Sequence, residues 1–240
     1  MARLTRKELK KDPFLSVYYD DFVEFAQKHY QKIIVVVTAI AVIVFAVTAW
    51  KHHEQQQEVS ANALLGAALA TFHAYVGQAS QDALGPGVQA FPTAADKYKA
   101  ALKEFSAVVE KYPRQKAAEI ALYHIGICQA QLGQDQAAVK TLQEASHASD
   151  RNIASLAQFA LADELARSGK LPEAEKIYRQ LAEQPTATVP APTAWLALAD
   201  LYRTKEPAQA RAIYERVAKE YGSNAYVAET VKQQLATLQR

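Results

Sequence analysis

An uninterrupted apolar run, Ile33 to Trp50, constrains this chain more than any other stretch. It contains eighteen residues without a charge, and eleven of them are Ile, Val or Phe. At about 1.5 Å per helical residue the run is roughly 27 Å long, close to the ~30 Å hydrocarbon core of a bilayer. Strands rarely exceed about ten residues, and core helices are seldom apolar on every side. We therefore predict a transmembrane helix over residues 33–50.

Basic residues are concentrated before this run, which predicts its orientation. Seven Lys and Arg precede it, whereas Lys51 follows it and the next basic residue is Lys97. Because positively charged flanks stay in the cytoplasm, residues 1–32 are predicted to be cytoplasmic and residues 51–240 to lie outside. The alternative is a cleaved signal peptide, but the leading region and the run are both long for one. We favour an uncleaved signal anchor.

The segment before the membrane, Phe14 to Gln31, has the pattern of an amphipathic helix. Asp12-Pro13 is a helix-start signal, and apolar residues recur at helical spacing. Such a helix either lies in the headgroup region or docks on a membrane partner, and an acidic cluster at Asp20-Asp21 keeps the second interpretation open.

The larger part of the chain has a composition typical of an all-α domain. Residues 52–240 carry nineteen Lys and Arg and twenty Asp and Glu, so they offer no basic surface for nucleic acid. Ala is frequent, and Gly and Pro are scarce. The single cysteine, Cys128, excludes an intramolecular disulfide.

Two features precede the main pattern of this domain. Leu65, Leu69, Phe72 and Val76 form a stripe that predicts a helix continuing from the membrane. The stretch from Gly77 to Thr93 contains several glycines and prolines, and predicts a flexible surface loop.

Beyond that loop the chain repeats itself. An alanine is followed four residues later by an aromatic residue or Leu, and the alanines are 37, 36 and 36 residues apart. A small residue lies upstream of each of the last three alanines, and in two of the pairs a turn glycine, Gly133 or Gly169, lies between the two helices. The repeated pairs are Ala101/Phe105, Ala138/Leu142, Ala174/Tyr178 and Ala210/Tyr214, and the small residues are Gly126, Ala162 and Ala199.

These residues resemble the tetratricopeptide repeat, in which small residues let paired helices approach and aromatic residues fill the space between pairs. The resemblance implies that the predicted transmembrane helix is followed by an all-α solenoid of about four helix pairs, with Tyr226 to Leu238 as a C-terminal capping helix. The fourth pair departs from the pattern, because it has Lys205-Glu206-Pro207 in place of the turn glycine and its turn is predicted to be one residue short.

The layout resembles the ancillary subunit of the bacterial Sec translocon, whose repeat domain faces the periplasm. That resemblance implies a bacterial inner-membrane protein with a periplasmic domain. The repeats also resemble those of outer-membrane assembly lipoproteins and the cell-division coordinator family. Since fold does not determine function, these relations remain analogies.

No arrangement of side chains in the sequence predicts catalysis, a cofactor or a metal site. His52-His53-Glu54 would diverge on a helix, and His124 with Cys128 supplies too few ligands for zinc. The carboxylate pairs Asp20-Asp21 and Asp163-Glu164 diverge in the same way. The protein is predicted not to be an enzyme.

The first helices of the repeat pairs are expected to line a concave groove. Aromatic residues there would anchor a partner, and charged residues would orient it. The predicted partner-binding residues are Tyr123, Ile127, Phe159, Asp163, Arg167, Asp200 and Arg203.

We therefore predict a membrane-anchored protein-interaction scaffold or chaperone-like accessory factor that acts on exported proteins at the translocon. Its partners would be proteins, namely translocon subunits or exported proteins, with no nucleic acid and no small-molecule substrate. One alternative is an envelope scaffold that coordinates cell division or outer-membrane assembly. The other is a structural subunit of a membrane enzyme complex, docked through residues 14–32.

Overall fold

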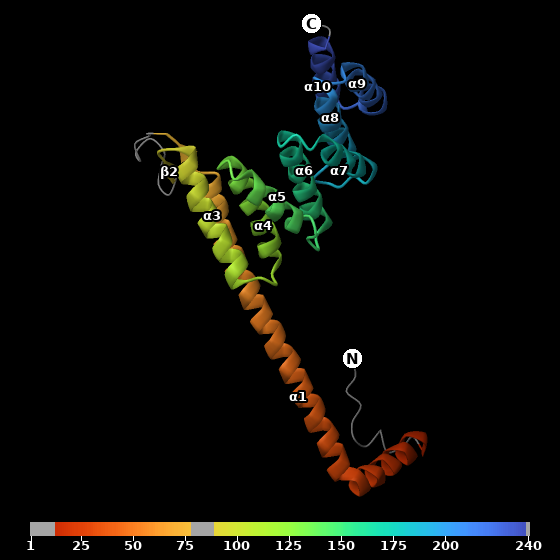
Figure 1. Ribbon diagram of the computed structural model, residues 1–240. Coiled ribbons are helices and arrows are strands. Elements are labelled where there is room, and N and C mark those ends of the chain that lie inside the picture. The colour runs from red at the N-terminus through yellow and green to blue at the C-terminus, as the bar shows by residue number, and fades with distance from the viewer. Residues whose placement is uncertain (1–12, 78–88, 239–240) are drawn as a thin grey trace. The chain divides into compact units, whose positions relative to one another are not determined.

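A computed structural model describes residues 13–77 and 89–238, with side chains from Phe25 onward (Figure 1). The chain divides into two compact units, Met1–Gln56 and Gln57–Arg240.

The first unit is built on helix α1 (Pro13–Phe72), which begins where the Asp12-Pro13 signal predicts. Its backbone leaves helical geometry at His29, with φ −120° and ψ 15°. The His29 ring stacks on Phe25 at a centroid distance of 4.6 Å, and its Nδ1 lies 3.2 Å from the Phe25 carbonyl. The predicted amphipathic pattern falls largely on side chains before Phe25, which lie outside the described residues.

The apolar run is helical throughout, and its two hydroxyl groups are satisfied within the helix. Thr38 donates to the carbonyl oxygens of Ile34 and Val35 at 2.9 Å, and Thr48 donates to that of Phe45 at 2.9 Å. This arrangement suits a lipid environment, where an unpaired hydroxyl is costly. In the described part of the chain, α1 is the one helix long and apolar enough to cross a membrane, and it lies near the N-terminus.

The last turns of α1 belong to the second unit, and α1 ends at Phe72, four residues before the end of the predicted apolar stripe. Val76 instead lies in strand β1 (Tyr75–Val76), which pairs in parallel with β2 (Ala90–Phe91). The assignment of Val76 to the helix was therefore wrong, because a short strand pairing closes the base of the insertion that follows. Gly77 follows at φ +145°, a conformation that favours glycine.

After the insertion, helices follow one another in pairs, and each packs on the next (Figure 1). The last turns of α1 pair with α3 through one apolar cluster, in which Phe72 and Phe105 contact edge to face. The remaining helices are α3 (Ala94–Lys111), α4 (Lys116–Gln131), α5 (Asp135–Ala145), α6 (Arg151–Arg167), α7 (Leu171–Glu183), α8 (Ala191–Tyr202), α9 (Pro207–Tyr221) and α10 (Ala225–Thr237). The predicted all-α solenoid of about four helix pairs with a capping helix is confirmed.

The repeated residues form the core of the solenoid, as their spacing predicts. All four alanines and their partners Phe105, Leu142 and Tyr214 are fully buried, and Tyr178 is 3% exposed. At Gly126 the helices approach so closely that an added Cβ would lie 2.6 Å from two side-chain carbons of Leu142. Small residues at this position are therefore required by helix contact.

The connections within the pairs differ in one respect from the prediction. Gly133 (φ +71°) and Gly169 (φ +80°) adopt the left-handed conformation that ends α4 and α6. In the fourth pair the connection 203–206 is not short; α8 ends at Tyr202, only three residues after Ala199, whereas α6 continues to Arg167, five after Ala162. The helix is thus two residues shorter and the connection one residue longer, which together give the net loss of one residue, and this turn contains no glycine.

The loop between α7 and α8, residues 184–190, is held by hydroxyl groups. Ser155 Oγ lies 2.7 Å from Thr186 Oγ1 and 3.1 Å from Thr188 Oγ1, and Thr188 donates to the Asn152 carbonyl at 2.9 Å. Val189, in the same loop, is 2% exposed and packs into the core. These contacts fix the start of α8 against α6.

Candidate functional site: a groove lined by the first helices

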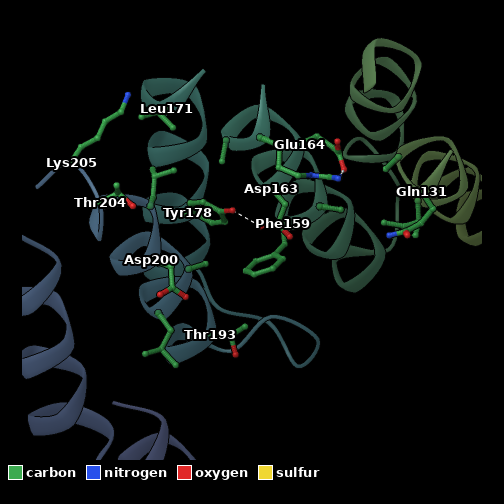
Figure 2. Close-up of a pocket in the computed structure, with 18 of the residues that line it drawn as sticks. Gln131, Phe159, Asp163, Glu164, Leu171, Tyr178, Thr193, Asp200, Thr204 and Lys205 are labelled. Carbon is green, nitrogen blue, oxygen red and sulfur yellow. Dashed lines mark hydrogen bonds and ion pairs between the residues drawn. The ribbon is translucent and has the colours of Figure 1, made fainter. Parts of the chain in front are cut away.

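An open groove of about 910 Å³ runs along the first helices of the repeat pairs (Figure 2). Its walls come from α4, α6 and α8, with contributions from α7, from the turn after α8 and from α10. Its floor is apolar and half-buried, and comprises Ile127, Phe159, Ala166, Leu196, Ala197 and Leu201. A groove of this kind suits an elongated partner that buries apolar side chains.

Five of the seven predicted partner-binding residues line this groove: Ile127, Phe159, Asp163, Arg167 and Asp200. The other two do not. Tyr123 is half-buried against the core, where burial and the Asp163 charge raise the pKa of its hydroxyl. Arg203 points toward the capping helix and donates to Gln234 Oε1 at 3.2 Å. The binding role of all seven residues remains a prediction.

Asp163 accepts a hydrogen bond from the hydroxyl of Tyr178, which projects from α7 (Figure 2). The carboxylate remains accessible to water, but the groove walls surround it. Burial raises the pKa of Asp163, although the Tyr178 hydrogen bond and the Arg167 charge act in the opposite direction. The Phe159 ring contacts Tyr178 edge to face at a centroid distance of 5.6 Å.

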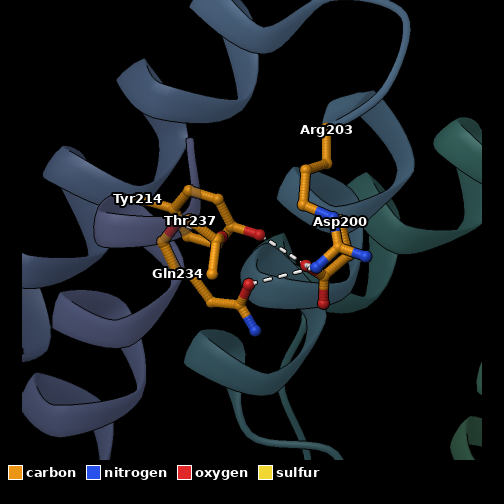
Figure 3. A network of polar contacts seen from close by, with 5 residues as sticks. All are labelled: Asp200, Arg203, Tyr214, Gln234 and Thr237. Atoms are coloured by element: carbon orange, nitrogen blue, oxygen red, sulfur yellow. Dashed lines mark hydrogen bonds and ion pairs between the residues drawn. The ribbon is translucent and has the colours of Figure 1, made fainter. Parts of the chain in front are cut away.

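Asp200 has the same arrangement one repeat later (Figure 3). It accepts a hydrogen bond from the hydroxyl of Tyr214 on α9, and its Oδ1 lies 3.9 Å from Arg203 Nη1. Burial and the hydrogen bond to Asp200 raise the pKa of Tyr214, so this hydroxyl stays protonated and donates. Tyr178 and Tyr214 occupy equivalent repeat positions, and so do Asp163 and Asp200.

The third carboxylate at the groove, Glu164, is paired. It is 3% exposed and forms an ion pair with Arg167, which is itself largely exposed. Its Oε2 is buried and has no hydrogen-bond partner among the described residues. Arg167 is therefore paired with Glu164, and its charge also acts on the neighbouring Asp163.

Several groove residues were missed by the sequence analysis. Leu196 and Ala197 could have been found, because they lie four and three residues before Asp200 on the same helix face. Tyr226 could not, because it comes from the capping helix and reaches the groove only through tertiary packing. Its side chain is 78% exposed, which is unusual for a large aromatic residue.

His124 and Cys128, which the sequence analysis considered as metal ligands, lie in an apolar cluster. His124 stacks on Phe105 with ring centroids 4.9 Å apart, and Cys128 is fully buried in the same cluster. Burial raises the pKa of the Cys128 thiol to about 12, so it is a poor nucleophile. Among the side chains that the structure describes, in residues 25–77 and 89–238, no three from His, Cys, Asp or Glu are grouped to hold a metal ion.

Two segments of the chain match the tetratricopeptide repeat family, residues 120–146 and residues 159–225. The first covers most of α4 and α5, and the second runs from α6 through α9. These two segments of the helical-repeat domain are thus similar to tetratricopeptide repeats. No curated protein and no solved structure matches the chain.

Proposed function

We propose that this protein is a membrane-anchored scaffold that holds segments of other proteins in the groove of its repeat domain. The observation that carries the proposal is the combination, on one chain, of an open apolar groove and a helix able to span a membrane. The groove floor supplies apolar contact area, and the charged side chains around it supply orientation.

In the finer form of the proposal, the scaffold acts on exported proteins at the translocon as a chaperone-like accessory factor of the bacterial inner membrane. Seven basic residues before the apolar run and one directly after it favour a cytoplasmic N-terminus and a periplasmic repeat domain. The layout resembles that of the translocon's ancillary subunit. The topology is tested with a reporter enzyme fused after Arg240. A reporter that is active only when it lies in the cytoplasm should be inactive in this fusion, and its activity would overturn the proposed orientation.

Partner binding is tested by photo-cross-linking in intact membranes. A photoreactive residue replaces Leu201 in the groove, and in a matched control it replaces Lys140, which is exposed on α5 outside the groove. We expect products with translocon subunits or exported proteins from position 201 and far fewer from position 140. Equal yields from the two positions would contradict groove binding. Products with only division or outer-membrane assembly proteins would instead support an envelope scaffold.

A further inference from the structure

The charges around the groove do not balance, and this imbalance indicates what kind of segment fits. Three carboxylates line it, Asp163, Glu164 and Asp200, against the cations Arg167 and Lys205. Glu164 and Arg167 pair with each other. Among the residues that the structure describes, Lys205 forms no ion pair with Asp163 or Asp200.

The two remaining carboxylates each keep a free acceptor. Tyr178 and Tyr214 donate to the Oδ1 atoms of Asp163 and Asp200. Within the described part of the chain, the Oδ2 atoms accept no hydrogen bond from a protein group. Arg203 Nη1 forms a long ion pair with Asp200 Oδ1 at 3.9 Å, beyond hydrogen-bond distance, and donates its hydrogen bond to Gln234.

Both carboxylates act on the hydroxyl of Tyr178. The hydroxyl of Tyr178 bonds to Asp163, and its pKa is raised by burial, by that bond and by the charge of Asp200 as well. Figure 2 shows Asp163 and Asp200 on the two sides of Tyr178, with Phe159 beside them. A cation placed there would face two negative charges with an aromatic ring at its side, a favourable environment for Lys or Arg.

Apolar contacts flank this position. Phe159 and Leu196 lie half-buried in the floor, and Tyr226 projects from α10 with 78% of its side chain exposed. An acidic position bordered by apolar side chains is complementary to a chain segment in which a basic residue is flanked by apolar ones.

We propose that the groove selects partner segments that are basic and apolar, with a Lys or Arg side chain held by Asp163 and Asp200 and apolar neighbours against Phe159 and Tyr226. This inference rests on the proposed function and specifies the chemistry of the partner. An acidic segment would place like charges together at the same position and is disfavoured.

The test measures binding of three fluorescent peptides to the full chain in nanodiscs of zwitterionic lipid, which do not attract basic peptides. The three peptides have the same apolar residues and differ only at their central positions. These positions are all Lys in the first peptide, all Gln in the second and all Glu in the third. We expect the Lys peptide to bind most tightly and the Glu peptide most weakly. Raising the salt concentration from about 0.05 to 0.5 M should weaken the Lys peptide alone.

Substitutions assign the effect to named side chains. Asp163→Asn and Asp200→Asn should each weaken the Lys peptide by about threefold to fivefold and leave the Gln peptide unchanged. Glu215→Gln, an exposed carboxylate on α9 outside the groove, is the matched control and should have no effect. Phe159→Ala should weaken the Lys and Gln peptides alike. Unchanged binding of the Gln peptide also shows that the Asn variants are folded.

Two failures are distinguishable. If the three peptides bind equally well and binding depends on Phe159, the charge selection is overturned while groove binding survives. If no peptide binds and position 201 yields no cross-linked product, the proposed function itself is overturned.

Discussion

Tyr178 donates a hydrogen bond to Asp163 across the helices of one repeat, and the next repeat reproduces the pair as Tyr214 and Asp200. The repeat before them has Leu142 at the tyrosine position and Ile127 at the aspartate position. The two positions are therefore either both polar or both apolar in a given repeat. This is expected if a buried tyrosine hydroxyl needs a hydrogen-bond acceptor.

Removing the hydroxyl of Tyr178 tests this pairing. Tyr178→Phe should lower the free energy of unfolding by about 1 to 2 kcal/mol, because a hydrogen bond to a charged acceptor is lost while the ring remains. Urea denaturation measures the change. Tyr226→Phe, at a side chain that is 78% exposed, is the control and should leave stability within about 0.5 kcal/mol. Equal effects at the two positions would contradict the pairing.

Gly126 is predicted to be a position where a single methyl group is harmful. Gly126→Ala should destabilise the protein by about 1 to 3 kcal/mol, because its Cβ would lie 2.6 Å from Leu142 and neighbouring side chains must move. The cavity-forming Leu142→Ala should cost about 2 to 5 kcal/mol alone. In the double variant the added methyl group occupies vacated space, so its cost should be less than the sum. Strict additivity in denaturation experiments would disprove the contact.

Acid should lower the free energy of unfolding of the repeat domain, because His124 is buried in its neutral form. Burial between aromatic rings, and next the charge of His73, lower the pKa of His124 to about 4 from an ordinary 6.5. The unfolded chain therefore binds a proton near pH 6.5 that the folded protein resists until about pH 4. The stability that neutral His124 contributes is complete above pH 6.5 and is lost as the pH falls toward 4, on the order of 1 to 3 kcal/mol.

Denaturation at pH 4, 5, 6 and 7 measures this dependence. His124→Leu should flatten the stability profile between pH 4 and 6.5, whereas His147→Gln, at an exposed histidine on the same domain, should leave the slope unchanged. A slope that survives in His124→Leu would assign the acid sensitivity to other groups.

Cys128 should be unreactive while the protein is folded. Its side chain is fully buried, and burial raises the pKa of the thiol to about 12, so the thiolate is scarce at pH 8. A chromogenic disulfide reagent should label it several orders of magnitude more slowly in buffer than in denaturant. Since it is the single cysteine of the chain, the signal has one source. Fast labelling of the folded protein would show that α4 opens readily.

The sequence determined those features that depend on local spacing. The apolar run of residues 33–50 predicts its own helix because no charge interrupts it, and the recurring alanines predict the solenoid because one face of each helix must be buried. Local spacing failed at Val76, where pairing with a strand beyond the insertion overrides the helical stripe. It also failed at the fourth turn, where α8 is shorter and the connection is not.

Only the tertiary structure decided which side chains meet in the groove. Asp163 and Asp200 follow from helical register, but their tyrosine partners come from neighbouring helices. The exposed Tyr226 reaches the groove from α10. Arg203 does not line the groove, because it donates a hydrogen bond to Gln234, which is also on α10. Spacing along one helix specifies which face is apolar; the angle at which successive helices stack specifies what that face meets, and this angle depends on the packing of all the pairs together.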